Sequence, residues 1–438
     1  MVDEGTAIRS RILELTRELV ALRQQGQVFI PGTTRVPYAG RVYDSAEVVA
    51  LVDSALDFWL TAGPQADTFE RRMGAFFQSR AFFLVNSGSS ANLLMLAALC
   101  AESTAKLSGP GRLVPGDEVI TPAVTFPTTL APILQHGLVP VFVDCEVGTY
   151  NIQAELVETA IGPRTKAIFV PHTLGNPCDM AILSDIAKRR GLWLLEDGCD
   201  ALGATFDGQL VGTFGALSSL SFYPAHHMTM GEGGGVVIND PALRRAVLSL
   251  RDWGRDCWCE PGKNDTCGKR FGWKAGELPE GYDHKYIYSH IGYNLKATDL
   301  QAAIGLAQLD KLPGFVAARR RNFRVLMEGL RSLEDRLILP SLDPRAEPSP
   351  FGFAVTVREG LDRKRLVQAL EREGIETRLL FGGNILRQPG FMGITHRTAG
   401  ELDGSDRIMR DTFFVGVYPG LTQAHLDHVL EAFHRHAR

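Results

Sequence analysis

The most informative stretch of this 438-residue sequence is Ser221-Phe222-Tyr223-Pro224-Ala225-His226-His227-Met228-Thr229-Met230-Gly231-Glu232-Gly233-Gly234. It sets two adjacent histidines between a run that begins with Ser-Phe and a turn that ends with Glu-Gly-Gly. An imidazole can act as a general base near neutral pH. The stretch therefore indicates proton chemistry, and the segments around it indicate the scaffold.

Short apolar runs alternate with helical patterns on either side of this stretch, from about residue 80 to residue 240. Four of these runs are residues 81–85, 139–143, 167–170 and 192–195. Apolar strands separated by helices are typical of a mostly parallel sheet that is covered on both faces. The sequence therefore predicts an α/β fold.

The remaining segments suggest how the chain is divided. Residues 8–25 carry apolar side chains at helical spacing, Asp44 and Glu47 form a capping-box pattern before a helix over 45–60, and a long helical pattern covers 297–333. We expect an N-terminal helical extension (1–40), a large domain (41–320) with an irregular loop at about 254–290, and a small C-terminal domain (321–438).

Composition excludes several classes of protein. The 46 basic and 50 acidic residues give a net charge of −4, so we expect no nucleic-acid partner. The acidic start does not resemble a signal peptide, and no apolar run reaches the roughly 18 residues that a membrane span needs. Seven cysteines in a chain of this length do not indicate a disulfide scaffold. We expect a cytoplasmic protein without a membrane segment.

Two segments after predicted strands suit a phosphorylated cofactor. Residues 86–91 (Asn-Ser-Gly-Ser-Ser-Ala) open a helix, where backbone N–H groups and hydroxyls at Gly88, Ser89 and Ser90 can bind a phosphate or simply cap the helix. Glu196-Asp197-Gly198 ends a buried apolar run, and its carboxylates suit either a cofactor or another helix cap.

These segments, taken in order, resemble the DegT/DnrJ/EryC1/StrS family of sugar aminotransferases over roughly residues 45–435. The stretch 221–234 matches the family pattern Ser-Phe-x-x-x-Lys…Glu-Gly-Gly, and residues 292–303 match Gly-Tyr-Asn-x-Arg/Lys…Asp-Leu-x-Ala-Ala. The resemblance implies a fold-type I, aspartate aminotransferase-like large domain that binds pyridoxal or pyridoxamine 5′-phosphate (PLP or PMP), followed by a smaller α/β domain.

The resemblance also assigns cofactor ligands. It implies that Asp197 pairs with the pyridine nitrogen, Phe126 lies against the ring, and Ser221 binds phosphate. Asn176 is expected to reach the phenolic oxygen. Asn294 and Lys296 are expected to cross a homodimer interface and reach the partner's cofactor. Taken alone, Lys296 is also read as a solvated charge. An isolated Phe126 would be assigned to the core.

His226 occupies the position of the family's catalytic lysine. Because histidine cannot form the imine that anchors the cofactor, we expect a cofactor held non-covalently, with His226 as the base. Asp200 and Tyr223 depart from the residues common in aminotransferases, and we expect both near the reacting carbon. The resemblance selects His226 over its neighbour His227.

Four cysteines add a second pattern: Cys199, Cys257, Cys259 and Cys267. Spacing alone leaves three interpretations open, namely an iron–sulfur cluster, structural zinc and unconnected thiols. The spacing resembles the 2Fe–2S ligand set of the CDP-4-keto-6-deoxyglucose 3-dehydrase branch of the family. That resemblance implies a 2Fe–2S cluster close to the cofactor.

Together these resemblances imply a PMP- and 2Fe–2S-dependent 3-dehydrase that deoxygenates carbon 3 of a CDP- or TDP-linked 4-keto-6-deoxyhexose. Its electrons are expected from a separate NAD(P)H-dependent flavin or iron–sulfur reductase, or from a ferredoxin or flavodoxin system. Lipopolysaccharide and antibiotic deoxysugar pathways both fit. The alternatives are a PLP-dependent ketosugar aminotransferase, a cluster-free ketosugar 3-dehydratase that uses glutamate, and a non-catalytic protein on the same fold.

Overall fold

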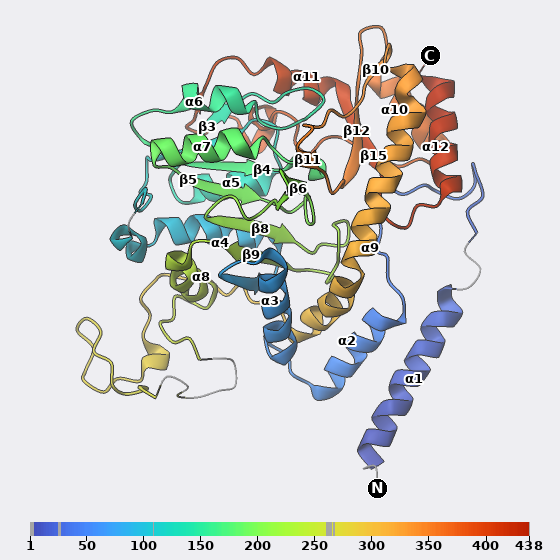
Figure 1. Ribbon diagram of the computed structural model, residues 1–438. Coiled ribbons are helices and arrows are strands. Elements are labelled where there is room, and N and C mark those ends of the chain that lie inside the picture. Colours follow the sequence, from blue (N-terminus) through green and yellow to red (C-terminus); the bar gives the residue numbers. More distant parts are fainter. Residues whose placement is uncertain (1–3, 25–27, 108, 260–264, 266–267, 438) are drawn as a thin grey trace.

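The computed structural model describes the chain except residues 1–3, 25–27, 108, 260–264, 266–267 and 438 (Figure 1). Its α-helices are α1 (Glu4–Gln24), α2 (Ser45–Asp57), α3 (Pro64–Phe77), α4 (Gly88–Cys100), α5 (Pro127–Gln135), α6 (Val157–Ala160), α7 (Met180–Arg190), α8 (Arg244–Arg251), α9 (Asp299–Leu330), α10 (Arg363–Arg372), α11 (Asp403–Asp411) and α12 (Gln423–His436).

The strands, in chain order, are β1 (Ala81–Val85), β2 (Glu118–Pro122), β3 (Val139–Val143), β4 (Thr165–Pro171), β5 (Trp193–Asp197), β6 (Thr205–Phe206), β7 (Gln209–Leu210), β8 (Leu217–Ser221), β9 (Gly234–Ile238), β10 (Leu337–Ile338), β11 (Ala346–Glu347), β12 (Gly352–Val357), β13 (Thr377–Arg378), β14 (Arg397–Thr398) and β15 (Thr412–Gly416). The four apolar runs of the sequence form β1, β3, β4 and β5, which confirms the predicted α/β fold.

The largest sheet has eight strands in the order β1-β9-β8-β5-β4-β2-β3-β14. Strand β9 runs antiparallel to both β1 and β8, whereas the pairs from β8 to β14 are parallel. The carboxyl ends of parallel strands meet at one edge of a sheet, and ligands in open α/β sheets bind outside this edge. Strands β5 and β8 bring Asp197 and Ser221 to that edge.

Alternating side chains bury both faces of this sheet. On β1, Phe83 and Val85 pack with α4, α5 and α8, whereas Phe82 and Leu84 pack with α3 and α9. Helices α6 and α7 cover the second face further along, against β3 and β4 (Figure 1). The helices thus fix the positions of the loops at the carboxyl edge.

A second sheet, of order β10-β12-β15-β13, packs on α10, α12 and the second half of α9. Helix α9 joins the two sheets, since its first half packs on the large sheet through Ala302, Leu309 and Leu312. The boundary expected between residues 320 and 321 therefore lies within one continuous helix.

The N-terminal helix α1 lies alongside α2, at the edge of the molecule (Figure 1). Arg9 links the two helices by donating to Asp53 at 2.6 Å and to Asp57. The capping box predicted before α2 is confirmed, because Asp44 accepts from the N–H of Ala46 and donates its own N–H to Glu47. In the described part of the chain, every helix is too short or too polar to cross a bilayer.

Candidate active site

A cavity of about 320 Å³ lies at the carboxyl edge of the large sheet, between β5, β8 and the start of α4. This volume is within the range of small-molecule sites. Helix α4 begins at Gly88, and Ser87 caps it by accepting the N–H of Ser90 at 3.0 Å. Gly88 and Ser89 line the cavity, so the helix N-terminus presents free N–H groups to an anion there.

Gly88 is required by the close approach of two other segments. A Cβ at this position would lie 2.7 Å from the Cβ of Ser221 and 2.9 Å from the sulfur of Cys199. Side chains do not approach that closely, so a residue other than glycine would push α4 away from β8. The packing therefore brings Gly88 close to Ser221 at the cavity, which Ser89 also lines, and their role in binding a phosphate stays a prediction.

Asp197 is held rigidly at the end of β5. One carboxylate oxygen accepts from Asn92 at 2.8 Å and from Thr129 at 2.7 Å. The other accepts from Ser219 and from the N–H of Cys199, both at 3.2 Å. Four donors orient the carboxylate, which lines the cavity although only 6% of the residue is exposed.

The preceding residue, Glu196, is fully buried behind the cavity. It accepts the N–H groups of Gly212, Phe214 and Gly215 at 2.6–2.8 Å. The Nε2 of His172 lies 3.2 Å from a Glu196 oxygen. Because the Nδ1 of His172 accepts the N–H of Cys178, Nε2 carries the proton and donates to Glu196. A buried carboxylate with this many donors is stable and fixes the end of β5 beneath Asp197.

His226 lies in the cavity beside Asp200. The Nδ1 of His226 is 3.3 Å from an Asp200 oxygen, although the two groups are not aligned as a hydrogen bond. The backbone carbonyl of His226 accepts from Arg319, which is buried and also donates to the carbonyls of Pro350 and Phe351. Burial lowers the pKa of Arg319 to about 10, and the group stays charged at neutral pH. Arg319 thus holds the loop that carries the histidine.

His227 faces away from the cavity, as the sequence predicted. It is buried, and its Nε2 lies 2.8 Å from the carbonyl of Ser349. Burial, together with the nearby Arg319, holds the pKa of His227 well below its usual value. A neutral imidazole bonded to the backbone is a structural group, and of the two histidines it is His226 that lines the cavity.

Aromatic side chains form the cavity walls. Phe126 is half exposed at the mouth, and its ring meets that of Phe381 edge-on at 6.1 Å. Tyr223 is also half exposed, with its ring centre 6.5 Å from that of His226. Phe351 packs against His226 at 5.2 Å. Phe126 and Tyr223 therefore both line the cavity, and their roles beside a cofactor stay predictions.

Two predicted cofactor ligands lie elsewhere. Asn176 donates to the carbonyls of Thr149 and Ser341, at 3.2 and 3.1 Å, and lines a different hollow. The turn after residues 173–175 points its amide away from the cavity, so the structure does not bring it to the cofactor site. Ser90 is engaged in the cap of α4, where its backbone N–H and its hydroxyl both meet Ser87.

Asn294 and Lys296 lie outside the cavity of their own chain. The Lys296 ammonium donates to Asn294 at 2.8 Å and lies 3.4 Å from the ring centre of Trp253. Burial lowers the pKa of Lys296. The predicted role of these two residues requires a partner subunit. It therefore stays a prediction.

The structure separates the cysteines that it describes. Cys199 lies on the cavity wall beside Asp197, whereas Cys257 and Cys259 line another hollow, next to Arg244 and α3. The Cys257 and Cys259 thiols lie beside each other. Cys267 lies outside the described residues. Among the described residues, no three metal-ligating side chains lie together, so the part of the ligand set that is described is not assembled around one centre.

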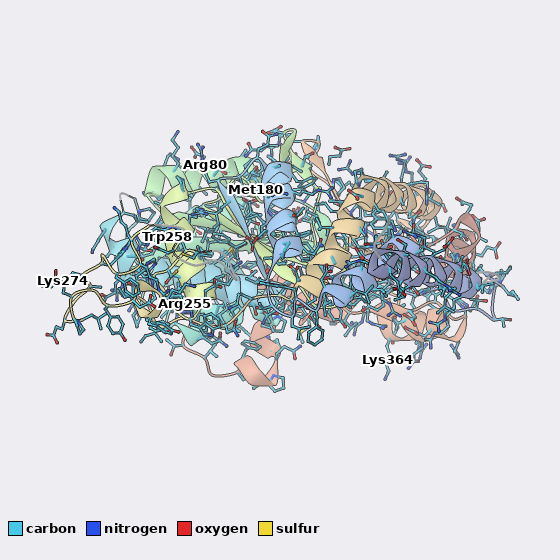
Figure 2. The ribbon with its side chains drawn as sticks, turned by 90° about the horizontal axis from the view of Figure 1, so that it is seen from below. Arg80, Met180, Arg255, Trp258, Lys274 and Lys364 are labelled. Atoms are coloured by element: carbon cyan, nitrogen blue, oxygen red, sulfur yellow. The ribbon has the colours of Figure 1, made fainter. Side chains whose placement is uncertain are left out.

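The cysteine-rich segment extends from one end of the molecule. Figure 2 places Arg255, Trp258 and Lys274 at this end, far from Lys364 of α10. Trp258, Trp273 and His284 pack on one another with ring centres 5.1–5.6 Å apart. The Arg245 guanidinium lies 5.5 Å from the Trp258 ring.

Sequence reasoning missed the residues that orient the predicted ones. Asn92 and Thr129 position Asp197, Arg319 anchors the His226 loop, and Arg378 reaches the cavity from the second sheet. Asn92 had a weak signal, since it lies one helical turn after Gly88 and so shares its side of α4. Thr129 lies three residues after Phe126, and Arg319 and Arg378 come from the C-terminal part of the chain.

Comparison with known proteins places this site in context. The sequence profile of the DegT/DnrJ/EryC1/StrS aminotransferase family matches residues 43–434. The chain is 49% identical, over 97% of each chain, to the lipopolysaccharide biosynthesis protein RfbH of Salmonella typhimurium. It is 51% identical to the dTDP-4-dehydro-2,6-dideoxy-D-glucose 3-dehydratase of Saccharopolyspora spinosa, over 97% of this chain and 91% of that one.

A solved structure shares the architecture. It is the E. coli GDP-4-keto-6-deoxy-D-mannose-3-dehydratase with bound hydrated PLP, with a TM-score of 0.81 and 32% identity, covering 91% of this chain and 99% of that one. This similarity confirms the predicted fold-type I, aspartate aminotransferase-like architecture.

Proposed function

The chain belongs to the DegT/DnrJ/EryC1/StrS aminotransferase family, and from this premise we propose that it is a PMP-dependent 3-dehydrase of a nucleotide-linked 4-keto-6-deoxyhexose. One observation carries the proposal. The side chain that the cavity offers at the family's lysine position is His226, and no lysine is among the described residues that line the cavity. An aminotransferase needs that lysine, whereas dehydration needs only a base.

The described residues fit a pyridoxamine phosphate. The α4 N-terminus and Ser221 would take its phosphate, Asp197 its pyridine nitrogen and Phe126 one face of its ring. The constraint on a Cβ at Gly88, and the four donors that fix Asp197, support this orientation. When bound, the cofactor supplies an amine that condenses with a ketone and a ring that accepts electrons.

The chain's own groups would then handle protons. His226 Nε2 is the atom that would take a proton from the cofactor's methylene carbon, because Nδ1 faces Asp200 at 3.3 Å. Phe351 packs against the His226 ring at 5.2 Å and limits how the ring turns. Tyr223, whose ring centre is 6.5 Å from that of His226, would together with Asp200 disfavour release of an aminosugar.

Net deoxygenation at carbon 3 requires an external reductant. Two electrons and two protons convert the carbon–hydroxyl bond to a carbon–hydrogen bond and water. We propose that Cys199, Cys257, Cys259 and Cys267 would hold a 2Fe–2S cluster, which when bound would supply one-electron chemistry between a separate reductase and the cofactor. The spacing of the four cysteines in the sequence supports this proposal, whereas the described thiols of Cys199, Cys257 and Cys259 do not surround one centre.

The substrate proposal rests on the relatives. Two of them are named as 3-dehydratases, one of a dTDP-linked and one of a GDP-linked sugar, and a third as a lipopolysaccharide biosynthesis protein. We propose a nucleotide-linked 4-keto-6-deoxyhexose in deoxysugar biosynthesis. The GDP-linked example has PLP in its structure, and it keeps a cluster-free 3-dehydratase as the second candidate.

We also propose a homodimer in which Asn294 and Lys296 complete the partner's cofactor site. Mixing His226→Asn chains with Lys296→Ala chains tests this. Composite sites predict that random mixing restores about a quarter of the wild-type activity, because half of the dimers then contain one intact site. No recovery after mixing would rule out shared sites.

An anaerobic assay tests the main proposal. The purified protein is supplied with PMP, a reductase system and either CDP- or dTDP-linked 4-keto-6-deoxyhexose, and the product is identified by mass. A 3-deoxy ketosugar supports the proposal, and an aminosugar would support the aminotransferase. Deoxygenation with glutamate and without reductase would support the cluster-free dehydratase.

A further inference from the structure

Trp253 has a backbone conformation that is unusual for a residue of its size. It lies two residues beyond the end of α8, and its φ is 63°, in the left-handed region that favours glycine. A large side chain in this region is strained, and such strain is concentrated at functional sites. The residue is 42% exposed, so burial of the indole does not account for the strain. The contacts of the indole indicate another reason.

The indole ring contacts cations from two segments. The Lys296 ammonium lies 3.4 Å from the ring centre, and the Arg255 guanidinium lies 4.9 Å from it. The negative face of an indole attracts cations. Lys296 also donates to Asn294 at 2.8 Å and lies 3.8 Å from a carboxylate oxygen of Asp252. These contacts fix the end of a side chain that is otherwise flexible.

The backbone holds the indole and the lysine beside each other. The N–H of Trp253 donates to the carbonyl of Tyr293 at 2.6 Å. A Cβ on Gly292 would lie 2.1 Å from the backbone nitrogen of Gly254, so the two segments touch backbone to backbone. This close contact sets the distance between the indole and Lys296, which lies on the second of the two segments.

We propose that Trp253 is a positioning residue that holds the Lys296 ammonium in place for the cofactor of the partner subunit. The inference rests on the proposed homodimer, in which Lys296 completes the partner's cofactor site. The described lining of the cavity in the same chain includes neither residue, so contacts within one chain do not support a role in its own site. Burial lowers the pKa of Lys296, and the π face of the indole favours the charged form, which suits an anionic cofactor.

Equilibrium binding of PMP to the full-length protein tests the inference without turnover. Trp253→Leu keeps a bulky apolar side chain but removes the π face. It should weaken PMP binding about tenfold, the loss expected for a cation–π contact with a largely buried ammonium. Trp253→Phe keeps a weaker π face and should lose less. Circular dichroism checks that both variants stay folded.

A double-mutant cycle separates positioning of Lys296 from a general structural effect. In Lys296→Ala chains the ammonium is already absent, so adding Trp253→Leu should weaken PMP binding no further. A tryptophan that only stabilises the fold would weaken binding by the same factor in both backgrounds. Additive losses would therefore overturn the inference.

Mixed dimers test whether the effect crosses the subunit interface. In mixtures of His226→Asn and Lys296→Ala chains, the intact site takes His226 from the Lys296→Ala chain and Lys296 from the His226→Asn chain. With PMP below its dissociation constant, Trp253→Leu in the His226→Asn chain should reduce the recovered activity about tenfold, in line with the loss of PMP affinity. The same substitution in the Lys296→Ala chain should leave the recovery unchanged. Equal recovery from the two arrangements would overturn the inference.

Failure of the proposed function looks different. If the wild-type protein deoxygenates no nucleotide sugar, the binding cycle still gives the non-additive result for Trp253 and Lys296. If cofactor sites are not shared between subunits, the parent mixture of His226→Asn and Lys296→Ala chains recovers no activity, whichever chain carries Trp253→Leu.

Discussion

The floor of the cofactor cavity and the cysteine-rich segment differ in how their structure is maintained. In the floor, Glu196 and Asp197 are buried, and each accepts hydrogen bonds from several donors of known position. In the segment after α8, large rings such as Phe271, Tyr286 and Tyr288 are more than half exposed. Its packing consists mainly of contacts among Trp258, Trp273 and His284.

The difference indicates where function depends on this chain alone. The cavity floor is complete within one chain, so single substitutions there have effects that follow directly from the geometry. The described part of the cysteine-rich segment is held by partly exposed contacts such as the Arg270–Asp283 ion pair, and its proposed role depends on a bound cluster. Four experiments bear on this contrast.

Substitution of a proposed cluster ligand should have the largest effect. Because a 2Fe–2S cluster has no spare thiolate, Cys259→Ser should abolish iron content, visible absorbance and net deoxygenation. Cys100→Ser is the control, since burial raises the pKa of that isolated thiol to about 12. Wild-type iron content and turnover in Cys259→Ser would contradict the cluster proposal. The proposal for the cofactor cavity would be unaffected by that result.

His226→Asn tests the cavity in the same way. An amide is not a base at neutral pH, so the rate should fall about 10²–10⁴-fold, the usual contribution of a positioned base. Exchange of the cofactor's methylene proton with solvent reports this step directly. Borohydride should not attach the cofactor to the wild-type protein.

His227→Asn is the matched control, because His227 faces Ser349 rather than the cavity. It should retain proton exchange at close to the wild-type rate. If exchange persists in His226→Asn and disappears in His227→Asn, the assignment of the base is wrong. If it persists in both, Tyr223 is the next residue to test.

Glu196→Gln should destabilise the floor without removing a group that contacts the cofactor. The carboxylate accepts hydrogen bonds from three backbone N–H groups. The amide of Gln replaces one accepting oxygen by an NH₂ group, so at least one of these buried N–H groups loses its partner. A loss of about 1–3 kcal/mol in the free energy of unfolding is expected. Urea denaturation measures it, with the exposed Glu232→Gln as control; equal stabilities would show that the network contributes little.

The smallest effect concerns pH. Burial keeps the pKa of His227 below its unfolded value of about 6.5, so the unfolded chain binds more protons as the pH falls. This contribution to stability is full above about pH 6.5 and is lost as the pH falls toward the folded pKa, by at most about 1.4 kcal/mol per pH unit. His227→Gln should flatten the decline between pH 7 and pH 5. Parallel curves of unfolding free energy against pH for the wild-type protein and His227→Gln would argue against this contribution of His227.

The sequence predicted the elements and much of the cavity, because both depend on local patterns. The apolar runs gave the bounds of β1 and β3, and Asp44 with Glu47 gave the start of α2. Residues on strand ends or helix starts, such as Asp197 and Gly88, line the same cavity because the topology brings those positions to one edge.

The remaining site residues depend on tertiary contacts that no short motif encodes. Asn176 follows a turn whose direction is set by the carbonyls of Thr149 and Ser341, the latter 165 residues away. Arg319 meets the His226 loop from 93 residues further along the chain. The position of Cys199 relative to Cys257 and Cys259 depends in the same way on long-range packing.

The two sides of the cavity also differ in when they can be built as the chain is synthesised. The contacts of Glu196 reach 16–24 residues along the sequence, and those of Asp197 reach back to Asn92 and Thr129 and forward to Ser219, so all donors of the floor are present once residue 219 has emerged. The opposite wall comes from Arg378, Phe381 and Phe414. Contacts of large sequence separation form late. The nascent protein therefore has a cofactor floor but no enclosed pocket until the last seventh or so of the chain has been made, which delays cofactor retention until synthesis is nearly complete.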